Sequence, residues 1–183
     1  MRSFVALALV ASAAVSAPAM AQSTGTVDIN GSVGDRCLFT SGNAVISVGE
    51  LTQGGASAAA GRLDPSKLNG QSRTLVGWCN GTAATMAVEA LPLVNTSFAS
   101  TAPVGFDTRI DYTASAAANG VTGTDSSVTA GAGTAVSVGL FSGNINVSLA
   151  SSSTPSSGLL VAGAYSGQVI VTLTPNISFG PAS

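Results

Sequence analysis

Short runs of alternating apolar and polar residues recur along this chain, and they limit its fold to β-structure. The first run lies in residues 24–37 (TGTVDINGSVGDRC), just ahead of the first of only two cysteines. Successive side chains of a strand point to opposite faces, so this run would present one apolar face. A strand this near the start of the chain can pair with its own domain or with another molecule, and the pattern leaves both open.

Further strand patterns follow, rich in β-branched residues and separated by Gly, Pro and Asn. We expect strands at residues 44–48, 74–79, 85–91, 109–113, 134–141, 144–149 and 168–174. Pro92 should end the third strand, and residues 142–143 should form a hairpin turn. One helical turn is expected within residues 54–61, and polar loops at 119–133 and 151–158. Short strands with one disulfide favour an all-β, immunoglobulin-like β-sandwich.

The first 21 residues have the pattern of a cleavable signal peptide. Arg2 supplies the positive charge, residues 4–15 are apolar, and Ala19, Met20 and Ala21 form a small-x-small cleavage site. Removing 21 of the 183 residues leaves 162, enough for one domain. No later run reaches the length of a membrane-spanning helix, so we expect no membrane span in the mature chain.

Cys37 and Cys79 are the only cysteines, and the chain has no histidine. Two cysteines in an exported chain usually form one disulfide, so we predict a Cys37–Cys79 bond. Free thiols or a metal pair are weaker alternatives, because there is no CxxC spacing and no histidine to complete a zinc site.

The composition argues against catalysis and nucleic-acid binding. Six basic and eight acidic residues give a net charge of −2, without the basic patch that nucleic acids require. The lack of histidine excludes a Ser-His-Asp arrangement, and no P-loop or nucleophile-elbow motif occurs. We therefore expect no enzyme activity, no cofactor and no metal.

Asp107, Arg109 and Asp111 form the one group of charges that needs its own interpretation. On a strand these three side chains would share a face. We interpret them as an ion-pair row on the surface rather than a pair of hydrolytic carboxylates. Calcium binding by loop acids such as Asp125 is disfavoured, because the acids are scattered singly.

Three segments, in the same order, resemble the chaperone–usher pilins, and most of all the archaic branch related to the spore coat protein U domain. Residues 25–33, running into Cys37, resemble the N-terminus of these pilins. Residues 75–79 (LVGWC) are similar to the strand that carries the second cysteine. Residues 163–174, which begin with the Gly-x-Tyr motif of Gly163 and Tyr165, resemble the final turn and strand.

The resemblance implies an immunoglobulin-like sandwich that lacks its last strand and is completed by a donor strand. Residues 22–36 would be the donor segment, residues 37–175 the pilin-like domain and residues 176–183 a tail, where the family commonly ends at its last strand. The donor residues that would enter a neighbour's groove are Val27, Ile29, Gly31 and Val33, with Gly31 leaving one pocket shallow. The groove would be lined by Val169, Val171 and Leu173, or by the opposite face with Ile170.

The function implied is that of a structural subunit of a bacterial surface fimbria, assembled by donor-strand exchange. Its partners would be identical or related pilin subunits, a periplasmic chaperone and an outer-membrane usher. It would pass through the periplasm to the cell surface. One alternative is a secreted, self-complete β-sandwich that binds a surface glycan or protein, in which residues 26–33 are an ordinary first strand. A second alternative is a minor or matrix-associated coat protein.

Overall fold

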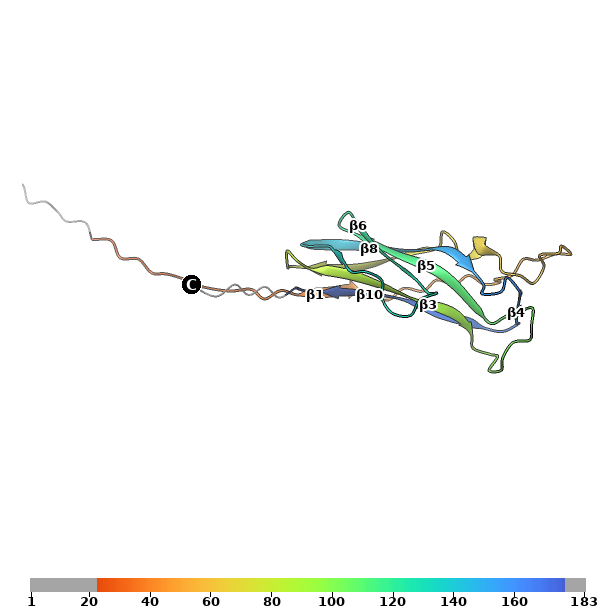
Figure 1. Ribbon diagram of the computed structural model, residues 1–183. Coiled ribbons are helices and arrows are strands. Elements are labelled where there is room, and N and C mark those ends of the chain that lie inside the picture. The colour runs from red at the N-terminus through yellow and green to blue at the C-terminus, as the bar shows by residue number, and fades with distance from the viewer. Residues whose placement is uncertain (1–22, 177–183) are drawn as a thin grey trace, which may run out of the picture. The chain divides into compact units, whose positions relative to one another are not determined.

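The computed structural model describes residues 23–176, which form an all-β structure (Figure 1). The predicted signal peptide, residues 1–21, and residues 177–183 of the predicted tail lie outside the described residues. A compact unit begins at Val33. Its strands are β1 (Cys37–Ser41), β2 (Ser72–Cys79), β3 (Thr85–Asn95), β4 (Phe106–Asp107), β5 (Arg109–Ala118), β6 (Val121–Ser126), β7 (Val136–Ser137), β8 (Phe141–Ser153), β9 (Leu159–Leu160) and β10 (Tyr165–Thr174), with a 3-10 turn at Pro65–Lys67.

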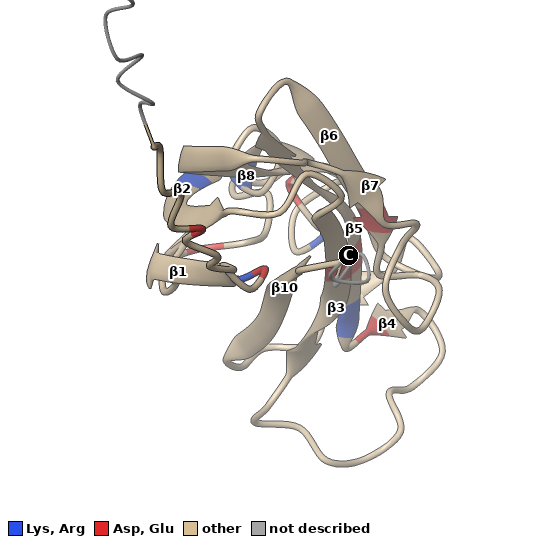
Figure 2. Cartoon of the chain, turned by 90° about the vertical axis from the view of Figure 1, so that its left-hand side faces the viewer, with Lys and Arg blue, Asp and Glu red and all other residues tan. Residues whose placement is uncertain are grey.

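The main sheet curls into a nearly closed, sandwich-like arrangement. Its strands follow the order β1-β2-β8-β5-β3-β10, every neighbouring pair antiparallel. β6 pairs with β5 and β7 with β3, while β4 and β9 form a small parallel pair. The curl brings the first and last strands of this order to face each other (Figure 2).

The core lies between the two halves of the curled sheet and follows the period-2 pattern of its strands. Alternate residues of β3, among them Met86 and Val88, are fully buried, as are Ile110 of β5 and Ile145 of β8. The C-terminal half of β5 fills its buried positions with small residues, Ala114, Ala116 and Ala118. The all-β sandwich expected from the sequence is therefore confirmed.

Several predicted element boundaries are wrong, for local physical reasons. Residues 44–48 form no strand, because Ile46 and Val48 reach the core from a loop whose Val45 carbonyl accepts a bond from Arg73 Nε at 2.7 Å. The predicted hairpin at residues 142–143 does not exist, since β8 runs straight through it and Gly143 pairs with Gly77. Residues 119–133 are not all loop because β6 lies within them, and residues 54–61 form turns rather than helix.

Pro92 does not end β3, which continues to Asn95. The register of β10 against β3 shifts between Ser166 and Gln168, so the missing N–H of Pro92 falls at a bulge, where a proline is tolerated. Gly167 lies at this bulge, where a Cβ would come 2.7 Å from the Pro92 carbonyl oxygen.

Tyr112 fixes this bulge from inside the core. Its buried side chain crosses from β5, and its hydroxyl lies 2.7 Å from the Leu91 carbonyl oxygen and 2.8 Å from that of Gln168. Burial, followed by the charge of Asp125, raises the pKa of Tyr112 to about 12. The hydroxyl therefore stays protonated at any physiological pH and can act as a hydrogen-bond donor. One hydroxyl thus ties the core strand β5 to both β3 and β10.

We expect Tyr112→Phe to lower the free energy of unfolding by about 1–2 kcal/mol, because two carbonyls lose their buried donor. Urea unfolding followed by circular dichroism measures this loss. Thr172→Ala, an exposed change on β10, one of the two strands that the Tyr112 hydroxyl contacts, is the control and should leave the midpoint in place. Equal midpoints for Tyr112→Phe and the parent chain would contradict the assigned role.

Candidate functional site: an open seam between β1 and β10

β1 and β10 are the two ends of the strand order, and within residues 23–176 each pairs with a neighbour on one side only. They lie beside each other across the open side of the curled sheet (Figure 2). β1 begins at Cys37 and β10 ends at Thr174 at the same end of the sandwich, because Cys37 pairs with Cys79 and Thr174 with Thr85. Each strand therefore offers a free row of backbone donors and acceptors.

The inner face of β10 is incompletely covered. Val169, Val171 and Leu173 alternate along it and pack against the core, yet they are only half-buried. On β3, by contrast, the corresponding inner residues Met86 and Val88 are fully buried. The sheet therefore presents apolar side chains beside an unpaired edge.

Phe39 of β1 completes this surface from the other side. A Cβ on Gly77 would lie 3.3 Å from Leu173 Cδ1 and 3.4 Å from Phe39 Cδ1, so both side chains come together over the backbone of Gly77. We call the half-buried set of Phe39, Val169, Val171 and Leu173 the seam. Ile170, the alternative considered from the sequence, lies on the opposite face and is 40% exposed.

The predicted donor residues lie in a segment that forms no strand. Residues 23–36 carry no strand, and the side chains of Val27, Ile29 and Val33 are 88%, 92% and 84% exposed. Gly31 has no atom within 4 Å of the place where its Cβ would be. Within the described residues, Val27, Ile29 and Val33 are therefore exposed apolar side chains.

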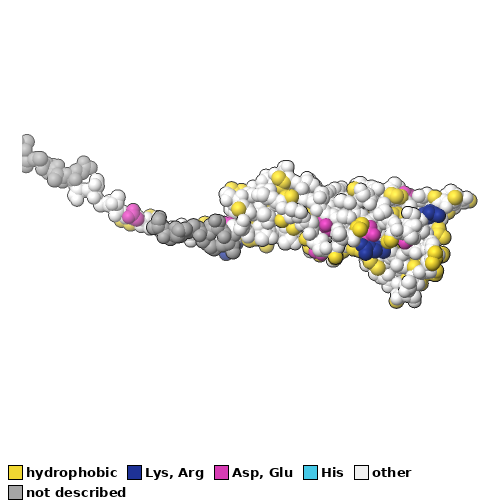
Figure 3. Space-filling view, in the orientation of Figure 1, with side chains coloured by type: hydrophobic (Ala, Val, Ile, Leu, Met, Phe, Trp, Pro, Cys, Tyr) yellow, Lys and Arg dark blue, Asp and Glu magenta, His cyan; other side chains and the backbone are white. Residues whose placement is uncertain are grey.

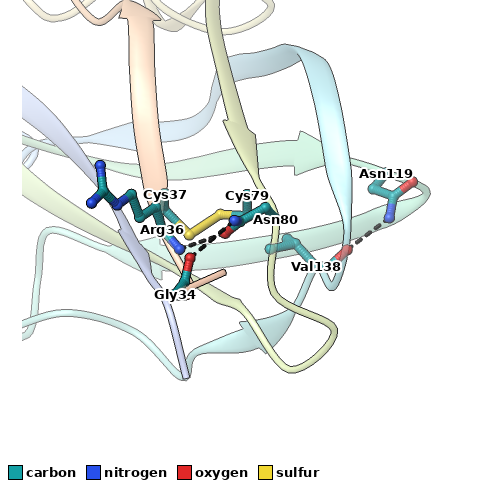
Figure 4. The surroundings of a disulfide bond; sticks show 7 residues. All are labelled: Gly34, Arg36, Cys37, Cys79, Asn80, Asn119 and Val138. Atoms are coloured by element: carbon teal, nitrogen blue, oxygen red, sulfur yellow. Dashed lines mark hydrogen bonds between the residues drawn. A yellow bond between two sulfur atoms is a disulfide. The ribbon is translucent and has the colours of Figure 1, made fainter. Parts of the chain in front are cut away.

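The start of β1 is held by a disulfide and by Asn80. Cys37 and Cys79 are bonded, as predicted, and lie opposite each other in the β1–β2 ladder. The Asn80 side chain accepts a hydrogen bond from the Arg36 backbone N–H and donates one to the Gly34 carbonyl oxygen at 3.1 Å (Figure 4). The backbone N–H of Asn80 donates to the Arg36 carbonyl oxygen at 3.0 Å. The sequence reasoning missed Asn80, whose position directly after Cys79 was the available signal.

The charged group at 107–111 is not the surface ion-pair row that the sequence suggested. Arg109 and Asp111 do pair, at 2.7 Å, but Asp111 is buried and also accepts a bond from the Ser127 hydroxyl. Asp107 is buried as well and binds elsewhere, accepting bonds from Ser156 and from the Gly158 N–H at 2.7 Å. These carboxylates anchor loops, because each is surrounded by donors.

The Gly-x-Tyr motif stabilises the turn that leads into β10. Gly163 has φ 148°, and a Cβ there would lie 2.6 Å from Asn95 Oδ1. The Tyr165 hydroxyl donates to the Val161 carbonyl oxygen at 2.8 Å. Both residues therefore set the start of β10, at the end of the strand opposite Thr174.

Within the described residues, no group of three or more His, Cys, Asp or Glu side chains is placed to hold a metal ion. The same residues contain no helix long and apolar enough to span a membrane. Comparison of the chain with protein-family models, curated proteins and solved structures finds no match.

We expect reduction of Cys37–Cys79 to lower the free energy of unfolding by about 4 kcal/mol, because the bond closes a loop between residues 42 positions apart. Urea unfolding with and without a reductant measures the change. A Cys37→Ser, Cys79→Ser double variant should match the reduced protein and show no response to the reductant. Identical midpoints for the oxidised and reduced forms would rule out this stabilisation.

A second prediction concerns the stability of the fold at low pH. Burial opposes the charged form of Asp107, but the bonds from Ser156, Gly158 and Thr154 outweigh it and hold its pKa below the ordinary value. The stabilisation is therefore fully present above the unfolded-state pKa of about 3.9 and is lost as the pH falls towards the lower folded-state pKa. We expect Asp107→Asn to show a smaller loss of melting temperature than the parent between pH 6 and pH 3. An equal decrease in the melting temperatures of the variant and the parent between pH 6 and pH 3 would contradict this.

Proposed function

We propose that this protein is a structural subunit of a bacterial surface fibre, in which the N-terminal segment of one copy fills the seam of the next. The observation that supports this most is a pair of complementary features in one chain. The seam has an unpaired edge beside half-buried apolar residues, and residues 27–33 offer an exposed, alternating apolar row without a partner. Strand addition joins such surfaces through backbone ladders and alternate side chains.

The chain direction favours pairing between copies over pairing within one. Asn80 ties Gly34 and Arg36 beside the start of β1. To enter its own seam, the segment 27–33 would have to reverse at residues 34–36 and run parallel to β10. A segment from another copy can run antiparallel to β10, as every neighbouring pair of the main sheet does.

The remaining elements of the proposal follow from the sequence and from the hazard of an open edge. Residues 1–21 would direct export, and a periplasmic chaperone would cover the seam until an outer-membrane usher hands the subunit to its neighbour. Uncovered, an apolar edge invites uncontrolled association. Because each contact joins two different surfaces, repetition gives an open filament rather than a closed ring. No reaction and no cofactor form part of this role.

Alternation along the N-terminal segment provides a sharp test. We expect Ile29→Ser to abolish or greatly slow fibre formation, because loss of about 2 kcal/mol of apolar burial weakens the contact roughly thirtyfold. Asn30→Ser, one position away on the outward face, should assemble like the parent. Electron microscopy and denaturant-resistant ladders on gels measure assembly.

The receiving strand allows the same design. Val171→Ser should impair assembly, whereas Ile170→Ser, on the opposite face of β10, should not. Deleting residues 22–33 should prevent polymerisation and leave the sandwich folded. Fibres formed by the deleted protein, or equal effects of the two changes within either pair, would refute strand addition.

A further inference from the structure

An apolar pocket lies at the end of the sandwich where β10 begins. It has a volume of about 390 Å³. The residues that line it come from the loop after β3, from β4 and from the region of β9, and all are apolar: Phe98, Pro103, Phe106, Leu160, Val161 and Ala162. Apolar side chains gather at the right-hand end of the molecule in Figure 3, the end that carries β4 in Figure 1. Phe106 is 41% exposed, so this pocket has apolar surface to cover.

The chain continues beyond β10 at the opposite end of the sandwich. Thr174 pairs with Thr85, whereas Tyr165, next to the pocket, pairs with Asn95. A strand of this length spans roughly 30 Å. The five residues after Thr174, residues 175–179, reach at most about 18 Å, so a tail cannot reach the pocket of its own subunit.

Strand addition would bring the tail of a neighbouring copy to this pocket. A donor segment antiparallel to β10 starts beside Thr174 and ends beside Tyr165, at the pocket end. From Val33 to Cys37 the chain then spans at most about 14 Å. The donor subunit's own Cys37 end, which also carries its Thr174, therefore meets the pocket end of the acceptor.

The sequence after Thr174 is suited to such a pocket. Residues 175–179 (PNISF) carry no charge, and Ile177 and Phe179 are spaced two apart, so both face one side of an extended chain. We propose that Ile177 and Phe179 of one subunit occupy the apolar pocket of the preceding subunit, as a second contact beside the added strand. This inference rests on the proposed function.

Photo-crosslinking in assembled fibres of the full chain tests the contact. Phe179 is replaced by p-benzoylphenylalanine, and fibres are grown from a mixture of isotopically light and heavy subunits. After irradiation, mass spectrometry should find position 179 joined to residues 98–106 or 159–162 of a different subunit. Phe106→Ser should lower the yield of this crosslink at least tenfold.

Val104→Ser is the matched control, because Val104 lies two residues before Phe106, in the loop that leads into β4, is fully exposed and does not line the pocket. It should leave the crosslink yield unchanged. If Phe106→Ser does not fold, Phe98→Ser tests the same wall of the pocket. Fibres without this crosslink, or with crosslinks only within one subunit, would overturn the inference and leave strand addition standing. A parent chain that forms no fibres would overturn both.

Discussion

The half-covered inner face of the edge strand β10 is the constraint on which the proposed assembly depends. On the neighbouring strand β3, the inner residues Met86 and Val88 are fully buried between the two halves of the sheet. At the seam the same alternation meets no further strand, so Val169, Val171 and Leu173 keep surface exposed to water beside free backbone groups. Hydrophobic burial and backbone pairing both favour an added strand at this place.

The fold class and the disulfide could be predicted from the sequence, because period-2 alternation and two cysteines in an exported chain are local signals. The residues at which individual strands begin and end could not be predicted in this way. Pro92 stays within β3 only because Gly167 makes a bulge opposite it, and residues 142–143 are strand because Gly77 pairs with Gly143. Both depend on partners far away in the chain.

The candidate site was predictable in part for the same reason. The resemblance to pilins implied Val169, Val171 and Leu173, or the opposite face with Ile170, but only the strand order shows that β10 is an edge and that Phe39 joins it from β1. The prediction of a surface ion-pair row at residues 107–111 was wrong, because alternation indicates which residues share a face of a strand but not which loop will fold over that face. Asp107 is buried and accepts hydrogen bonds from Ser156 and Gly158, about fifty positions later in the chain.

The hydroxyl of Tyr112 has a consequence for association. By joining Leu91 and Gln168 it positions the edge strand β10 from inside the core, while Cys37–Cys79 positions β1 on the other side. The two strands that flank the seam, β1 and β10, are thus both held in place within the single subunit. An incoming segment would lose its own conformational freedom but impose little on the receiver, and such preorganisation favours tight and slowly reversed binding.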